Sequence, residues 1–306
     1  MKLLVLALID RQYPQLLRKM NAKFTALRRL LPQTRCYIIG DGRPEQMRGY
    51  DFTYIHETDI EDKIACCYNL SESLRPDLIY MRYPSAYNPL LRYVSAFPNI
   101  VLEHNTIEGQ EYTGCFREQE LALGPQIIAA SAGVIGVTRE IAEYERQRSR
   151  PDLPIFVLPN SLDTVSEEEP DERPSLSPGM TLHMIMAARF DSWHGVERII
   201  EGIAQSAIRS KFVLHLVGDG PALAKYHRLV REHGLSNQVI FHGWLDPAEL
   251  QKIYAQCHLA FGAIGIARKG LHEACAIKVR EYCAMGLPFV LAGSDPDFQM
   301  DLPFVH

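Results

Sequence analysis

The chain has 306 residues, of which 47% are hydrophobic and 23% charged, and its net charge is −5 at pH 7. This balance is typical of a soluble globular protein and excludes disordered and collagen-like chains. No apolar run approaches the roughly 20 residues that a transmembrane helix needs. The apolar start, residues 1–10, is too short for a signal peptide and lacks a cleavage site, so we expect a first β-strand and a cytoplasmic protein.

The seven cysteines form no C-x-x-C pair and have no histidine partner at zinc spacing. An odd count that includes one adjacent pair favours reduced thiols packed as small apolar groups. We therefore expect neither a disulfide framework nor a zinc site built on cysteine.

The first half of the chain alternates short apolar runs with stretches of helical periodicity. Seven candidate strands lie at residues 3–9, 36–39, 52–55, 78–81, 100–103, 133–137 and 155–158. The first helical pattern, residues 12–31, repeats its apolar residues every three or four positions. Strand–helix alternation of this kind predicts a parallel, doubly wound sheet over residues 1–163.

A break in this pattern separates the two halves. Residues 164–179 are rich in proline, serine and acidic side chains, which predicts an interdomain linker. Alternation then restarts, with strands expected at 182–187, 212–217, 239–241, 259–261 and 289–291, and helices at about 195–208, 221–234, 247–256 and 277–285. We expect a second Rossmann-like domain over residues 180–306. Because the chain stops at 302–306 just as another strand begins, its C-terminal end looks truncated, unless the fold is shorter than expected.

The N-terminal helix predicts a possible contact with membranes. Residues 1–31 hold seven basic residues against one acidic residue, and Arg18, Lys19, Lys23 and Arg28 lie on the flank of the helix. An ordinary helix with a solvated basic flank explains this pattern. The alternative is a peripheral contact with an anionic inner leaflet, where a lipid-linked acceptor would lie.

The stretch from Glu273 to Pro288 is the most informative part of the sequence. Small residues at 274–276 precede a helix expected from about Ile277, whose N-terminus would suit a diphosphate. Glu273 and Glu281 are eight positions apart, about 12 Å at the helical rise, which roughly matches the separation of the two sugars in a nucleotide sugar. One carboxylate for each sugar is chemically reasonable.

Three strand-end loops point to the same ligand. Arg189 follows the strand at 182–187, where a guanidinium can bind phosphate bidentately. Gly218 and Gly220 end the next strand and would bring backbone close to a ligand. Gly243 and Trp244 end the third, where a base could lie against main chain. Each signal alone is weak, and their order makes them specific.

This ordered set resembles the donor domain of the family-4 glycosyltransferases of the GT-B fold. Their motifs read G-R-x4-K-G, V-G-D-G-P, F-x-G and E-x7-E followed by A-x-G-x-P, and the similarity covers about residues 181–292. Segments 136–140 and 158–163 also resemble this family. The chain departs from the pattern at His194, which replaces lysine, at Ala188, which replaces glycine, and at 274–276, which replace Gly-Phe-Gly.

The resemblance implies a role for each matching position. Arg189 would bind the donor pyrophosphate with help from His194, Glu281 the ribose hydroxyls, and Glu273 the transferred sugar. Backbone at Ala276 and Ile277 would cap the phosphate, and His104, at the end of an N-domain strand, would be an active-site histidine. The implied reaction is a retaining, metal-independent transfer from a UDP- or GDP-sugar to a saccharide or lipid-linked acceptor, in glycan or polysaccharide biosynthesis.

Other functions remain open or are excluded. A dehydrogenase would need a third glycine after Gly218 and Gly220, and the first strand is followed by none. A catalytically silent GT-B partner subunit and a nucleotide-sugar epimerase remain alternatives. Nucleic-acid binding is disfavoured because the basic residues are not interleaved with aromatics. Asp295 and Asp297 resemble a metal-binding D-x-D but follow the last strand, so we expect a loop, no metal site and no cofactor.

Overall fold

The structure is a computed structural model that describes residues 1–9, 14–42, 49–162, 177 and 179–298. The side chains of Pro14, Gln15 and Arg18 lie outside this description. The chain divides into two compact units, Met1–Asp163 and Thr164–His306. Most of the predicted linker and the C-terminal residues 299–306 lie outside the described residues. In the described part, no helix is both long and apolar enough to span a membrane.

The first unit is built on a seven-stranded parallel sheet in the order β3-β2-β1-β4-β5-β6-β7. Its strands are β1 (Leu3–Ile9), β2 (Arg35–Gly40), β3 (Thr53–His56), β4 (Leu78–Arg82), β5 (Ile100–His104), β6 (Gly133–Gly136) and β7 (Ile155–Val157). The helices are α1 (Pro14–Leu30), α2 (Ile60–Leu74), α3 (Asn88–Ala96), α4 (Glu108–Glu111), α5 (Gly114–Ala130) and α6 (Arg139–Arg148).

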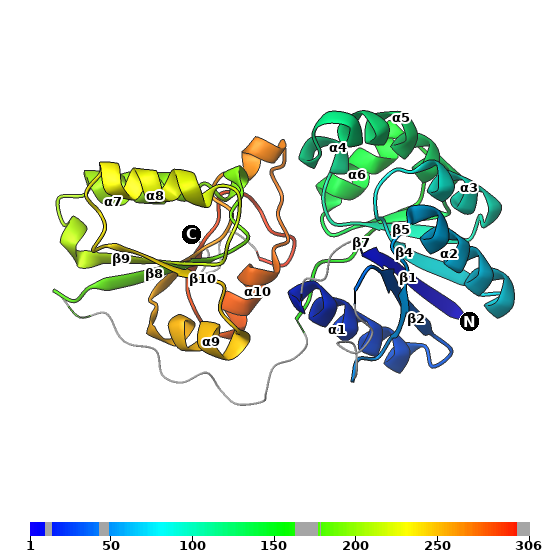
Figure 1. Cartoon of the computed structure of the whole chain (residues 1–306), viewed down its shortest axis with the longest axis horizontal. Helices are drawn as coiled ribbons and strands as arrows, with labels where there is room; N and C mark the ends of the chain where they lie inside the picture. The colour runs from blue at the N-terminus through cyan, green and yellow to red at the C-terminus, as the bar shows by residue number, and fades with distance from the viewer. Residues whose placement is uncertain (10–13, 43–48, 163–176, 178, 299–306) are drawn as a thin grey trace. The chain divides into compact units, whose positions relative to one another are not determined.

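Strand β1 shows why an unbroken apolar run forms a central strand. All seven of its residues are buried, because helices cover both faces of the sheet (Figure 1). Leu4, Leu6 and Leu8 belong to the core cluster that α2, α3 and α5 complete. The alternate residues pack with Leu17 and Phe24 of α1. The two faces of one strand therefore serve two separate cores.

The second unit repeats this plan with five parallel strands in the order β10-β9-β8-β11-β12. The strands are β8 (Leu182–Ala187), β9 (Phe212–Val217), β10 (Val239–Gly243), β11 (Leu259–Phe261) and β12 (Phe289–Val290). The helices are α7 (Val196–Gln205), α8 (Leu223–Glu232), α9 (Pro247–Gln256) and α10 (Ile277–Ala284), with 3-10 turns η2 (Ser192–His194), η3 (Arg209–Lys211) and η4 (Ile266–Lys269).

Helices α7 and α8 cover one face of this sheet, and α9 and α10 the other (Figure 1). Met184 and Met186 face the first pair, whereas Ile185 packs with Tyr254 of α9 and Tyr282 of α10. The predicted fold class of two doubly wound parallel α/β sheets is confirmed. In each unit the parallel strands end at one edge, which gathers the loops that follow them.

Candidate functional site

Main-chain contacts hold together the loops at the carboxyl edge of the second sheet. The amide of Ala188 donates to the carbonyl of Val217 (2.9 Å), and that of Phe190 donates to Asp219 (2.7 Å). The Gly218 amide donates to the Gly243 carbonyl at 2.6 Å. The ends of β8, β9 and β10 are thus one bonded assembly.

Gly218 and Gly220 are required by this assembly. Gly218 has a φ of +122°, and a Cβ there would lie 2.0 Å from the carbonyl oxygen of Ala188. Gly220 has a φ of +151°, and its Cβ would lie 2.4 Å from the carbonyl oxygen of Phe190. The sequence predicted that these glycines admit a ligand. The structure shows that they let the neighbouring loop approach, and contact with a ligand stays a prediction.

His194 is a buried structural residue of the loop after β8. Its Nδ1 accepts the amide hydrogen of Asp191 at 3.0 Å and so completes a capping box at η2. Burial, together with the nearby charge of Lys278, lowers the pKa of His194 to about 2. The imidazole is therefore neutral at physiological pH. It does not replace the positive charge of the lysine that the resemblance leads one to expect here.

Lys278, in the first turn of α10, is a basic residue close enough to His194 to lower its pKa. The residue as a whole is half-buried, but its Nζ is buried and has no hydrogen-bond partner among the described residues. Burial lowers the pKa of Lys278 to about 7, an effect that Glu281 opposes. The sequence analysis missed this residue. Its position inside the otherwise uncharged run from Ala274 to Val279 was the available signal.

Glu281 lies one turn beyond Lys278 on α10. Its Oε2 accepts the hydroxyl hydrogen of Tyr254 at 3.2 Å. Burial raises the pKa of Glu281, and the Tyr254 hydrogen bond and Lys278 work against that shift. The carboxylate is therefore held in a fixed orientation beside a cation.

Glu273 lies outside helix α10, contrary to the spacing argument. The helix begins at Ile277 with Ala276 as its N-cap, and no side chain caps it. Glu273 instead forms an isolated parallel bridge with Ser294. The sequence-based distance of about 12 Å assumed helical rise over all eight positions, so it does not apply. The predicted helix itself is confirmed.

The remaining predicted donor residues differ in exposure. Arg189 is 63% exposed, and its Nη1 lies 3.7 Å from Oδ2 of Asp191, whose amide contacts His194. Trp244, directly after β10, is 54% exposed. Arg189 and Trp244 are accessible to a ligand, whereas the Nζ of Lys278 is covered.

Asp295 and Asp297 both bind the guanidinium of Arg280. Arg280 donates to Asp295 through Nη1 (2.5 Å) and Nη2 (2.6 Å), and Nη2 also contacts Asp297. This bidentate ion pair occupies the carboxylates that resemble a D-x-D motif. It ties the loop after β12 to helix α10.

His104 lies at the carboxyl end of β5 in the first unit and is 0% exposed. Its Nδ1 lies 3.0 Å from Oε2 of Glu108, and its ring stacks on Tyr83 with centroids 4.2 Å apart. Burial lowers the pKa of His104 and raises that of Glu108 to about 8. Three consecutive residues, His104, Asn105 and Thr106, each carry a buried side-chain atom with no partner among the described residues.

Three of the basic side chains of α1 have partners within their own unit. Lys23 pairs with the buried Glu103, Lys19 donates to Asn105 at 2.7 Å, and Arg28 lies 3.6 Å from Asp51. The positive charge of Lys23 lowers the pKa of Glu103 to about 2 against the opposing effect of burial. These contacts compete with any anionic surface for the same cations. Membrane binding stays a prediction.

The two sheets and the loops at their carboxyl edges define the chain as a protein of the GT-B fold. Residues 167–296 match the family of Glycosyl transferases group 1, which supports a glycosyltransferase. No curated protein matches the sequence.

Solved glycosyltransferases share the fold at low sequence identity. The chain is 15% identical to the lipopolysaccharide outer core galactosyltransferase WaaB in its apo form, covering 97% of this chain and 82% of that one with a TM-score of 0.64. It is 14% identical to HepE from Anabaena in complex with UDP, covering 96% of this chain and 82% of that one with a TM-score of 0.64. It is 15% identical to WaaG, a glycosyltransferase involved in lipopolysaccharide biosynthesis, covering 94% of this chain and 80% of that one with a TM-score of 0.62.

Proposed function

We propose that the chain is a retaining, metal-independent glycosyltransferase that uses a nucleotide-diphosphate sugar. The observation that carries this proposal is the buried, unpartnered Nζ of Lys278 at the start of α10. A buried ammonium with no hydrogen-bond partner among the described residues is costly even with the charge of Glu281 nearby, so the site favours an anion that completes it. The same unit also carries the exposed guanidinium of Arg189, and a diphosphate offers a partner to each of these two cations.

The carboxylates orient the rest of the donor. Glu281, fixed by Tyr254, would accept hydrogen bonds from the ribose hydroxyls, and Glu273 from the transferred sugar. Ala276 and Ile277 would present backbone N–H groups of the helix start to the phosphate. The Gly243–Trp244 segment would lie along the base. The solved HepE structure with UDP and glucose supports a donor of this kind.

In the proposed reaction an acceptor hydroxyl attacks the anomeric carbon on the face from which the diphosphate leaves. The bond from that carbon to the phosphate oxygen breaks, the bond to the acceptor oxygen forms, and the hydroxyl proton passes to the departing phosphate. Lys278, Arg189 and the positive end of α10 would stabilise the leaving charge. Protein groups thereby take the role that a divalent cation has in other transferases.

The first unit would bind the acceptor, a saccharide either free or lipid-linked. Residues 104–106 follow β5 at the carboxyl edge of the sheet, where parallel α/β sheets bind ligands. Their unpartnered atoms, Nε2 of His104, Nδ2 of Asn105 and Oγ1 of Thr106, can bond to sugar hydroxyls once the loop opens. His104 would then be the group of this unit that reaches the reacting sugar.

A donor screen followed by turnover tests the proposal. UDP-, GDP-, ADP- and dTDP-sugars are compared by thermal shift, since a bound ligand raises Tm by mass action. The best donor is then incubated with saccharide acceptors, and we expect transfer with retention at the anomeric carbon. Donor binding without turnover would favour a silent partner subunit, and release of an epimerised nucleotide sugar would favour an epimerase. No stabilisation by any donor would contradict the proposal.

A further inference from the structure

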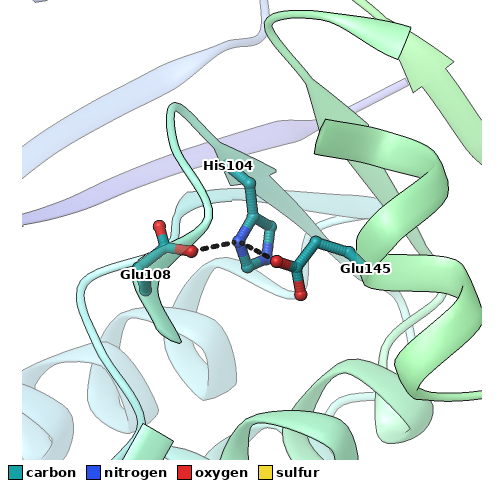
Figure 2. Close-up of side chains that lie close together, drawn as sticks. All are labelled: His104, Glu108 and Glu145. Atoms are coloured by element: carbon teal, nitrogen blue, oxygen red, sulfur yellow. Dashed lines mark hydrogen bonds and ion pairs between the residues drawn. The ribbon is translucent and has the colours of Figure 1, made fainter. Parts of the chain in front are cut away.

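Three side chains of the first unit converge on one buried point (Figure 2). His104 ends β5, Glu108 lies in α4 and Glu145 in α6. Nδ1 of His104 is 3.0 Å from Oε2 of Glu108 and 3.8 Å from Oε1 of Glu145. One ligand atom from each residue lies within 4.8 Å of the others. The end of a strand, the short helix that follows it and a helix later in the chain thus place a nitrogen and two oxygens around a common centre.

One of these oxygens has no hydrogen-bond partner. Oε1 of Glu145 is buried and accepts no hydrogen bond from any described residue, although it faces His104. Its other oxygen accepts from Nε of Arg148 at 2.5 Å. Buried carboxylate oxygens are normally satisfied, so an orphaned oxygen aimed into a ligand-like cluster points to a bound group.

The charges around this point are unbalanced. Arg148 bridges Glu145 and Glu120, with its Nη2 2.7 Å from Oε1 of Glu120. Glu120 also accepts from Tyr83 and from the amide of Ala86, so its oxygens are satisfied. Of the three buried carboxylates, those of Glu108, Glu120 and Glu145, only the last two pair with this guanidinium. When all three are ionised, the surplus of two negative charges equals the charge of one divalent cation.

Gly124 shows that the fold makes room for this cluster. A Cβ at Gly124 in helix α5 would lie 2.3 Å from Oε1 of Glu120 and 2.5 Å from Nη1 of Arg148. The missing side chain allows the ion pair to lie against the helix. The same residues that hold Glu145 in place thus depend on a small residue in a third element.

We propose that Nδ1 of His104, Glu108 and Glu145 bind one divalent transition-metal cation, with Zn²⁺ as the best match. Imidazole and carboxylate ligands at about 2.0–2.2 Å in a tetrahedron lie roughly 3.3 Å apart, close to the separations of 3.0 and 3.8 Å. Arg148 on Glu145 and Tyr83 against the imidazole supply the outer contacts that orient metal ligands. Such an ion leaves Nε2 of His104 as an N–H donor. The inference does not depend on glycosyl transfer.

Two other groups in the second unit serve as controls. Cys275, Asp295 and Asp297 also cluster, but Arg280 already bonds to both aspartates. His183, His215 and His242 form a row of imidazoles joined at 3.0 and 2.9 Å across β8, β9 and β10. Asp297→Asn and His242→Gln therefore remove alternative metal ligands without touching the proposed site.

The test is the zinc content of the full chain, produced in zinc-supplemented medium and dialysed. We expect about one Zn²⁺ per chain, a zinc-edge absorption spectrum with only nitrogen and oxygen ligands, and at least tenfold less zinc in Glu108→Gln and Glu145→Gln. Asp297→Asn and His242→Gln should retain the metal. Should the cluster variants fail to fold, the content and spectrum of the unaltered chain decide alone. Zinc-free protein, sulfur ligation, or zinc content that ignores both cluster variants would overturn the proposal and leave protons to neutralise the carboxylates.

Discussion

The carboxyl edges of the two sheets bury ionisable groups of opposite type that lack hydrogen-bond partners. In the second unit the Nζ of Lys278 is buried with no hydrogen-bond partner among the described residues. In the first unit the buried cations already have partners, since Lys23 pairs with Glu103 and Arg148 with Glu120 and Glu145, and carboxylates are in surplus. A buried charge without compensation indicates a ligand of the opposite sign. The comparison therefore assigns an anion to one edge and a cation to the other.

The two edges also differ in how they are held together. Beside the first edge, ion pairs of Arg148 with Glu120 and Glu145 join α5 and α6, whereas at the second edge Gly218 and Gly220 let strand-end loops pack main chain against main chain. Close main-chain packing tolerates only small residues, whereas an ion pair is lost when either charged side chain is replaced by a neutral one. Substitutions should therefore damage the two edges by different routes.

The largest expected effect is on the loops of the second edge. Gly218→Ala should lower the free energy of unfolding by about 2–5 kcal/mol, because it adds backbone strain at positive φ to a clash with Ala188. Gly243→Ala is the matched control, since its φ is also positive, at +66°, but nothing lies within 4 Å of its Cβ. It should cost only about 1–2 kcal/mol. Urea denaturation measures both, and equal losses would contradict the packing account.

Lys278→Met should give the largest change in ligand binding. Removing a charge-assisted contact to phosphate costs about 1.5–3 kcal/mol, or roughly 10- to 150-fold in Kd for the nucleotide sugar. The same variant should keep or raise Tm, because an uncompensated buried charge is lost. Lys225→Met, at a cation that lies 3.6 Å from Glu197, is the control. Calorimetry on both variants checks this, and unchanged affinity in Lys278→Met would refute the role of Lys278.

Substitutions of Glu281 and Glu273 should have different effects on ligand binding and on turnover. Glu281→Ala should weaken binding of the free nucleotide diphosphate and of the sugar donor alike. Each affinity should fall by about tenfold, or about 1.4 kcal/mol. Glu273→Ala should instead lower kcat with the sugar donor and leave the affinity for the free nucleotide diphosphate nearly intact. Parallel losses for both ligands in Glu273→Ala would remove Glu273 from the transferred sugar.

We expect the smallest effect, on transfer activity, from removing free divalent cations with EDTA. Transfer should persist in EDTA and gain nothing from added Mg²⁺ or Mn²⁺, because protein groups meet the leaving charge. A zinc ion in the first unit is buried and should stay bound during a brief exposure, so bound zinc is measured in the same sample. Activity that vanishes in EDTA and returns with Mg²⁺ would show that a metal acts on the diphosphate.

The sequence predicted the fold well for a physical reason. Buried parallel strands read as unbroken apolar runs, and β1, β8, β9 and β11 begin and end where those runs do. The site was harder to predict. No sequence pattern reveals that the Nζ of Lys278 is buried, or that Nδ1 of His194 accepts the amide hydrogen bond of Asp191. Glu120 and Glu145 look like solvated helix acids until the packing of α5 against α6 buries both and brings Glu120 to Arg148.

The pH dependence of donor affinity tests the central claim, that Lys278 binds the diphosphate, most directly. Burial gives Lys278 a folded-state pKa of about 7, and a bound diphosphate must raise that pKa, since it favours the charged form. The lysine is already protonated below pH 7, so affinity for a UDP- or GDP-sugar should be greatest there. Above pH 7 binding must take up a proton, and affinity should fall by up to about tenfold per pH unit.

Lys278→Arg keeps its charge throughout this range, so its affinity should be flat from about pH 7 to pH 9. The account predicts a falling curve for the unaltered chain and a flat one for this variant, measured by calorimetry with the same nucleotide sugar. A flat curve for the unaltered chain, or the same fall in both proteins, would contradict it.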